Sequence, residues 1–146
     1  MINCLECGAA ASACESRFHE FLVREFESEY GAVHHLTVAT YMLQHSSKLT
    51  AEGWLYERQL LREFLIEKKS PARIRKQNKD RLDSGKRNFK FKAVDGLPKI
   101  ARSAWTKTIM DVRTDNADVY CSDVTAWAQA ALADVETEQV IIPERP

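Results

Sequence analysis

The sequence is poor in the residues that make tight turns, with only five glycines and four prolines among 146 residues. Sandwiches and barrels of β-strands need many turns, so this composition argues against both folds. No stretch approaches the roughly 20 consecutive apolar residues that a membrane-spanning helix needs. The opening residues lack the basic start and apolar run of a signal peptide. We therefore expect a cytoplasmic protein of one domain, residues 1–146, without membrane contact.

The charges are segregated along the chain, although the formal net charge is zero. Residues 1–67 carry a net charge of −5, and residues 93–146 carry −4. Between them, residues 68–92 hold eleven Lys or Arg and two Asp or Glu, which gives +9. A basic segment therefore separates two acidic ones.

Apolar residues recur every three or four positions over most of the chain, which indicates helices. The helices that we expect span 14–29, 33–46, 51–69 and 115–136, and Ser70-Pro71 is expected to begin a short exposed one. Residues 88–94 alternate apolar and basic, as a short β-ribbon would, and 105–112 fits either a strand or a helical turn. We predict a mostly α, single-domain bundle of about five helices, with one such ribbon.

Four parts follow from this pattern. They are an N-terminal zinc knuckle (1–13), a helical hairpin with a third helix (14–69), a basic segment (70–92) and a C-terminal part (93–146).

Three of the four cysteines lie within the first fourteen residues. Cys4-x-x-Cys7-Gly8 has the form of a zinc knuckle, in which a tight turn presents two thiolates to one ion. In the cytoplasm disulfides are rare, and clustered cysteines more often bind metal. A redox pair and an unliganded pair are the alternatives, although no βαβ pattern surrounds the motif to support redox chemistry. Cys121 is expected to be an ordinary half-buried side chain.

Two further ligands are needed to close a tetrahedral site. If the helices expected at 14–29 and 33–46 pack antiparallel, Cys14 and His45 lie at the same end of the hairpin. His34 lies at the other end, since eleven residues of helix span about 16 Å. The predicted set is Cys4, Cys7, Cys14 and His45 around a structural Zn²⁺, with His34 or His35 as the next candidates for the fourth ligand.

The motif CxxCGA, Cys14 at the start of a helix, and "YGAVHHLTVATYMLQHS" resemble a family of small uncharacterised bacterial proteins. That family has a CPxCG start and a segment like HRLTVDxYxxQHP, and "TIMDV" and "VTAWAQAA" are similar to its final part. The resemblance places His34 and His45 on the two family histidines and Ala39 on an aspartate, so chemistry that needs this carboxylate is not expected here. Because the family has no established activity, the resemblance supports the metal set rather than a function.

The basic segment offers a surface for a polyanion. Its candidate contacts are Arg73, Arg75, Lys76, Lys79, Arg81, Lys86, Arg87, Lys90 and Lys92. Phe89 and Phe91 between the last lysines could stack on bases. A solvated loop is the plainer alternative. We predict a zinc-stabilised binding or adaptor domain that meets nucleic acid or an acidic protein.

A small enzyme or metabolite-binding protein is the competing hypothesis. His34, Thr37 and Tyr41 would form its site, because seven residues of helix return His34 and Tyr41 to one face. Capping or packing is the more usual role for a histidine at a helix start. The sequence holds no nucleophile elbow, P-loop, dinucleotide fingerprint or H-E-x-x-H motif.

Overall fold

The computed structural model describes residues 3–83 and 105–136, and these residues form helices and no strand. The six α-helices of these ranges are α1 (Cys14–Arg24), α2 (Ser28–Gly31), α3 (His34–Leu43), α4 (Ala51–Leu65), α5 (Pro71–Asp83) and α6 (Ala117–Glu136). Short 3₁₀ helices lie between them: η1 (Ala10–Ser12), η2 (Ser46–Lys48) and η4 (Ile109–Asp111). The mostly α, single-domain fold is confirmed. The ribbon expected at 88–94 lies outside the described residues.

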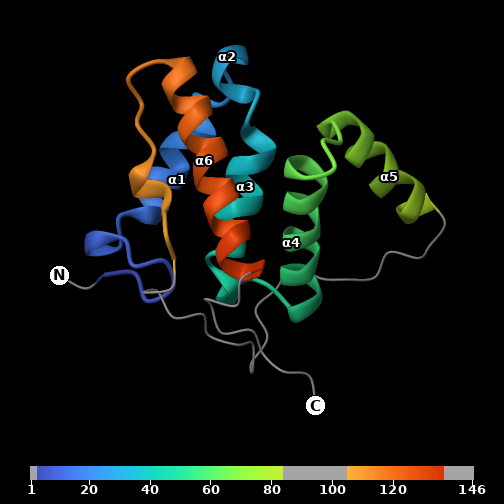
Figure 1. Ribbon diagram of the computed structural model, residues 1–146, viewed down its shortest axis with the longest axis horizontal. Helices are drawn as coiled ribbons and strands as arrows, with labels where there is room; N and C mark the ends of the chain where they lie inside the picture. Colours follow the sequence, from blue (N-terminus) through green and yellow to red (C-terminus); the bar gives the residue numbers. More distant parts are fainter. Residues whose placement is uncertain (1–2, 84–104, 137–146) are drawn as a thin grey trace.

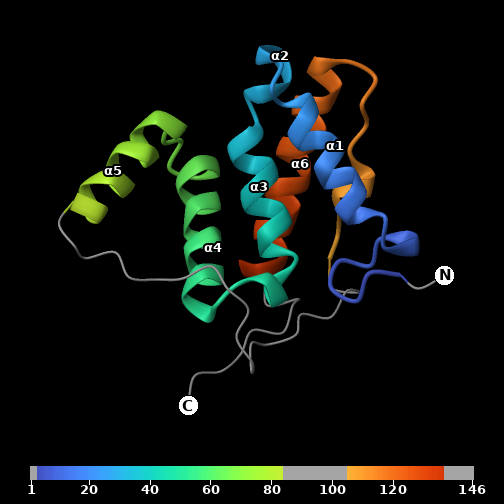
Figure 2. The same cartoon turned by 180° about the vertical axis from the view of Figure 1, so that it is seen from behind.

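Helix α3 is the centre of the bundle, with α1, α4 and α6 packed around it (Figure 1). Helices α1 and α3 run in opposite directions, and α2 joins them at one end (Figure 2). The largest side chains with no appreciable exposure come from α1, α3, α4, α6 and the segments next to them: Trp127, Tyr120, Phe21, Leu43, Leu49, Leu61 and Ile109. The hydrophobic core therefore joins the N-terminal hairpin to the C-terminal helix.

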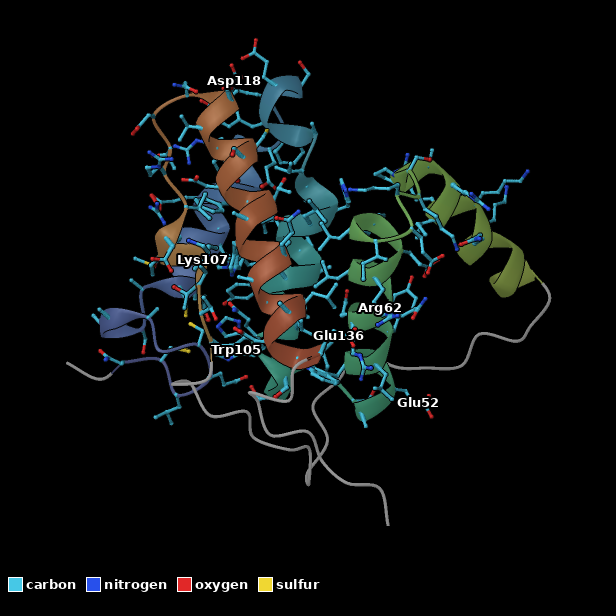
Figure 3. All side chains as sticks on the ribbon, in the orientation of Figure 1. Glu52, Arg62, Trp105, Lys107, Asp118 and Glu136 are labelled. Atoms are coloured by element: carbon cyan, nitrogen blue, oxygen red, sulfur yellow. The ribbon has the colours of Figure 1, made fainter. Side chains whose placement is uncertain are left out.

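The polar edge of the bundle also ties these elements together. Arg62 of α4 pairs with Glu136 at the end of α6 (Figure 3). Arg17 of α1 donates to the carbonyl of Ile109, 3.3 Å away, in η4. None of the helices described is both long and apolar enough to cross a membrane.

Two predicted helix starts are confirmed by their capping contacts. The Thr50 hydroxyl accepts a hydrogen bond from the amide of Gly53 at 2.9 Å, which is an N-cap contact for α4. Ser70 does the same for α5, where its hydroxyl lies 3.1 Å from the amide nitrogen of Arg73. Both caps satisfy amide groups that have no partner inside the helix.

The helix expected at 14–29 is instead two helices, because α1 ends at Arg24 and Glu27 has an extended backbone before α2. The apolar face therefore stops early, and Phe26, which has the helical spacing to continue it, is 90% exposed. This break accounts for the sixth helix.

The helix expected at 33–46 ends at Leu43, whose carbonyl accepts a hydrogen bond from Trp54 Nε1 at 3.0 Å. His45 leaves the helical conformation with φ −128° and ψ 61°. It follows α3 rather than belonging to it.

Other boundaries differ by a few residues. The third helix was expected to reach residue 69, but α4 ends at Leu65, and Lys68 has a positive φ of 59°. This left-handed residue turns the chain away, so α5 stands apart from the bundle (Figures 1 and 2). The ambiguous segment 105–112 holds the helical turn η4.

Candidate metal centre

A tight turn presents the first two cysteines. The amide of Gly8 donates to the carbonyl of Cys4, and the amide of Cys4 donates to the carbonyl of Ala9, both at 2.9 Å. Gly8 has a φ of 88°, a conformation that residues with a Cβ rarely adopt. The glycine that follows Cys7 is thus what allows the knuckle to close.

Four donor side chains meet at this turn. One ligand atom from each of Cys4, Cys7, Cys14 and His45 lies within 4.8 Å of every other. Donors bound at about 2.3 Å in a tetrahedron are about 3.8 Å apart, so this spacing suits one ion after small adjustments. Cys7, Cys14 and His45 are only 2%, 3% and 4% exposed. The structure therefore brings together the predicted ligand set, which could hold a metal ion.

The four donors reach the cluster from three places in the chain. Cys4 and Cys7 come from the N-terminal turn, Cys14 is the first residue of α1, and His45 follows α3. Because α1 and α3 run in opposite directions, the start of one lies beside the end of the other. This is the hairpin geometry that the sequence predicts.

His45 is oriented by the backbone of α3. Its Nδ1 lies 2.6 Å from the carbonyl oxygen of Tyr41, and the two rings stack with centroids 4.0 Å apart. A carbonyl can only accept, so Nδ1 carries the proton and the neutral ring has its lone pair at Nε2. A metal-binding histidine is commonly held in this way by a carbonyl behind it.

Glu6 holds the knuckle against the end of α3. Its carboxylate accepts hydrogen bonds from the hydroxyl and the amide of Ser47, the latter at 3.2 Å. The carbonyl of Glu6 accepts a further hydrogen bond, 2.9 Å long, from Trp105 Nε1. Segments at positions 6, 47 and 105 therefore fix the cysteine turn relative to His45.

The electrostatics of the cluster suit a cation. Burial raises the pKa of the Cys7 thiol, and negative charge on Cys14 and Cys4 would raise it further. Burial also raises the pKa of Cys14. Burial opposes ionisation of Cys4, but hydrogen bonds from the backbone of Cys7 and Glu6 outweigh it and lower that pKa. Three crowded thiols ionise together only when a positive ion compensates them.

Cys121 takes no part in this cluster. Its thiol contacts the carbonyl of Glu29 at 3.4 Å, and the side chain is partly buried, as expected. The fourth-ligand alternatives also lie elsewhere. His34 contacts Glu25, and His35 packs edge-on against Phe64 with ring centroids 4.3 Å apart.

The three α3 residues predicted to form an enzyme site, His34, Thr37 and Tyr41, lie in two different places. Tyr41 stacks against His45 and Phe18, beside the metal cluster. His34 and Thr37 instead meet at Glu25, to which they contribute contacts of 2.7 and 2.5 Å. The structure therefore does not bring Tyr41 together with His34.

Glu25 is the site residue that sequence reasoning missed. Its side chain has no exposed surface, and it receives hydrogen bonds from His34, Thr37 and Tyr120, the last at 2.5 Å. Burial, followed by Glu25 itself, raises the pKa of Tyr120, so the phenol stays protonated. A signal exists in the sequence, because position 25 continues the apolar 18-21-22 spacing of the first helix. A carboxylate on an apolar face needs buried partners.

Only some of the basic residues predicted to bind a partner lie within the described residues. Four of them are exposed on α5: Arg73, Arg75, Lys76 and Lys79. Arg81 belongs to α5, and nothing is described of its side chain. The remaining ones lie outside the described residues: Lys86, Arg87, Lys90 and Lys92.

Comparison with known proteins assigns the chain to a protein family. No curated protein and no solved structure matches the chain. The model of a family of unknown function matches residues 2–136. This agrees with the uncharacterised family that the motifs suggested, while its bacterial origin and the motifs themselves stay predictions. The chain belongs to the family of unknown function DUF5946.

Proposed function

We propose that the chain is a zinc-stabilised binding domain that uses α5 to contact nucleic acid. The observation that carries this proposal is the exposure of α5, which stands apart from the bundle (Figure 1). Ile74 is only 5% exposed and fastens the helix, while Arg73, Arg75, Lys76 and Lys79 are exposed around it. Exposed cations on one helix can neutralise phosphates and release their counterions.

Zinc is the metal that the donor set favours. Thiolates and imidazole suit Zn²⁺, and the Cys₃His combination is typical of structural zinc sites. Such a site is closed to substrates because the protein fills all four positions. The ion would fasten the N-terminal turn to α1 and α3, and so stabilise the bundle that carries α5.

The salt dependence of binding tests the nucleic-acid proposal. A labelled DNA duplex is titrated with the full chain, and anisotropy is recorded over a series of salt concentrations. The double variant Arg73→Ser/Lys76→Ser removes cations one turn apart on α5 and should reduce the slope of log K against log salt by about 2. The control variant Lys107→Ser/Arg113→Ser removes two exposed cations elsewhere and should leave the slope unchanged.

Equal effects of the two double variants would contradict a role for α5. Binding to polyglutamate with the same affinity and salt slope would instead assign the surface to an acidic protein. Zinc content is measured separately on each sample, so a failure of DNA binding does not affect the metal assignment.

A second candidate function rests on the contact between His34 and Glu25. The buried carboxylate accepts a hydrogen bond from Nδ1–H of His34, which leaves the lone pair at Nε2 of this half-exposed imidazole to accept a proton. Carboxylates orient general-base histidines in this way. We infer that His34 would be the acid–base residue if the protein acts on a small metabolite, with Glu25 and Thr37 as positioning residues.

The tautomer of His34 tests this second candidate. Long-range proton–nitrogen NMR should show the neutral ring of His34 protonated at Nδ1 in the wild type, and a larger share of the other tautomer in Glu25→Gln. His19, which is exposed, is the internal control. A neutral His34 protonated at Nε2 in the wild type would exclude the proposed role.

A further inference from the structure

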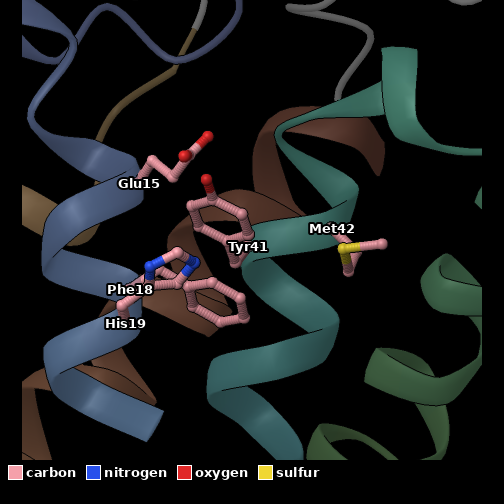
Figure 4. Close-up of a pocket in the computed structure, with 5 residues that line it drawn as sticks. All are labelled: Glu15, Phe18, His19, Tyr41 and Met42. Carbon is pink, nitrogen blue, oxygen red and sulfur yellow. The ribbon is translucent and has the colours of Figure 1, made fainter.

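A cavity of about 240 Å³ lies between α1 and α3 (Figure 4). None of the four candidate metal ligands lines it, although Tyr41, which does, stacks on His45. Glu15, Phe18 and His19 of α1 line one side, and Tyr41 and Met42 of α3 line the other. Phe18 and Met42 supply apolar surface, and the other three residues supply polar groups. A concave site with a few polar groups on an apolar wall is a common form of small-molecule pocket.

Tyr41 supplies a hydroxyl group to this pocket. The residue is only 2% exposed, and its ring is fixed between Phe18 and His45, with centroid separations of 3.9 and 4.0 Å. No hydrogen bond joins its hydroxyl to another residue in the described part of the chain. The hydroxyl points to the same side of the pocket as the Glu15 carboxylate (Figure 4). The hydroxyl is not among the buried side-chain atoms without a partner, so it is open to solvent at the pocket and can bind water or a ligand.

The polar groups of the pocket share one property, which is the ability to accept hydrogen bonds. The carboxylate of Glu15 only accepts, while the Tyr41 hydroxyl and one nitrogen of a neutral His19 can accept as well. Glu15 adds a negative charge, and no cationic side chain lines the cavity. A group with several N–H donors and a positive charge complements these three acceptors.

We propose that this pocket binds a protonated primary amine that carries a small apolar or aromatic group. The ammonium would donate to Glu15, Tyr41 and His19. The apolar part would contact Phe18 and Met42, whose aromatic and thioether groups are favourable partners for a ring. The small volume restricts the ligand to a compact molecule.

A ligand bound at Tyr41 should also affect the environment of His45 in the metal cluster. Its ring stacks on His45, and its carbonyl accepts the hydrogen bond that orients the same imidazole. A ligand that contacts the Tyr41 hydroxyl should therefore alter the NMR signals of His45. The proposal itself does not depend on which metal, if any, is bound.

The experiment uses the full chain with equimolar Zn²⁺, titrated with benzylamine and followed by NMR. Benzyl alcohol, which has the same ring without the charge, is the control ligand. Benzylamine should bind saturably, with the largest shifts at Phe18, His19 and Tyr41. Glu15→Gln should weaken binding about tenfold, and Tyr41→Phe, which keeps the ring, about fivefold. The matched variant Glu20→Gln removes an exposed carboxylate of α1 outside the pocket and should change nothing.

Three results would overturn the proposal. They are the absence of saturation, equal affinity for benzyl alcohol, and equal effects of Glu15→Gln and Glu20→Gln. Spectra of each variant without ligand establish that it is folded. If Tyr41→Phe disturbs the fold, Glu15→Gln alone decides, because Glu15 is exposed and its replacement preserves shape.

Discussion

His45 Nδ1 donates to the carbonyl of Tyr41, four residues before it, across 2.6 Å. This contact selects the tautomer that leaves Nε2 available, and Nε2 is the atom that a metal at the cysteine cluster would bind. The fourth ligand is therefore oriented by the final turn of α3 before any ion enters.

The first prediction compares two cysteines. Cys14→Ser should lower the free energy of unfolding of the zinc-loaded protein by several kcal/mol, since ion binding at such sites is worth on the order of 10 kcal/mol and is coupled to folding. Cys121→Ser replaces a partly buried thiol away from the cluster and should cost less than about 1 kcal/mol. Urea unfolding in the presence of Zn²⁺ measures both values. Equal losses would argue against the ligand assignment.

The second prediction concerns the buried carboxylate. Tyr120→Phe removes a hydrogen bond to Glu25 and leaves the aromatic packing in place, so it should destabilise the protein by about 1.5–3 kcal/mol. Tyr30→Phe is the matched control, because Tyr30 packs edge-on against the Tyr120 ring without contacting Glu25 in the described structure. Thermal unfolding distinguishes the two variants. A control as damaging as Tyr120→Phe would show that the hydrogen bond to Glu25 contributes little.

The third prediction is that Gly31→Ala lowers, rather than raises, the stability of the protein. A methyl group at position 31 would lie 2.6 Å from the carbonyl oxygen of Glu25, which is part of the backbone. Gly31→Ala should therefore destabilise the protein by about 1–3 kcal/mol through overpacking. Without the clash, alanine in a helix would instead stabilise by up to about 1 kcal/mol. A more stable variant in urea unfolding would mean that Gly31 is not closely packed against Glu25.

The fourth prediction concerns pH. Burial raises the pKa of Glu57 from 4.5 to about 7, so the folded state holds this proton more tightly than the unfolded state. The contribution of Glu57 to stability is then greatest below pH 4.5 and is lost as the pH rises to 7. Glu57→Gln should match the wild type at pH 4.5 and exceed it at pH 8, by at most roughly 3 kcal/mol.

The contribution of His35 to stability has the opposite pH dependence and must be separated from that of Glu57. Burial lowers its pKa from 6.5 to about 4, so its contribution is present above pH 6.5 and is lost as the pH falls toward 4. Differences between Glu57→Gln and the wild type at each pH remove this background. Glu52→Gln, at an exposed position of the same helix, is the control for the change from a carboxylate to an amide. A constant difference between Glu57→Gln and the wild type would contradict the raised pKa.

The closeness of the four donors could be predicted from the number of residues between each donor and the turn of the helical hairpin. Antiparallel helices joined by a short turn place Cys14 near His45, whatever the side chains between them do. The four side chains lie close together, as the hairpin geometry predicts, even though His45 lies beyond the end of α3.

The break between α1 and α2 could not be predicted, because local periodicity continues through it. Phe18, Phe21, Leu22 and Phe26 have helical spacing, but Glu25 receives hydrogen bonds from α3 and α6. Those partners are distant in sequence, so tertiary contacts override the local pattern. The pocket at Tyr41 was missed for the same reason, since the side chains that line it come from two helices.

Metal content is the most direct test of the account. Elemental analysis of the 146-residue chain, purified without added metal, should give one equivalent of zinc per chain. Cys14→Ser and His45→Ala should fall well below one equivalent, while Cys121→Ser keeps it. A folded wild-type protein that neither carries zinc nor takes up one equivalent on addition, or a zinc content that is unaffected by Cys14→Ser, would contradict the account.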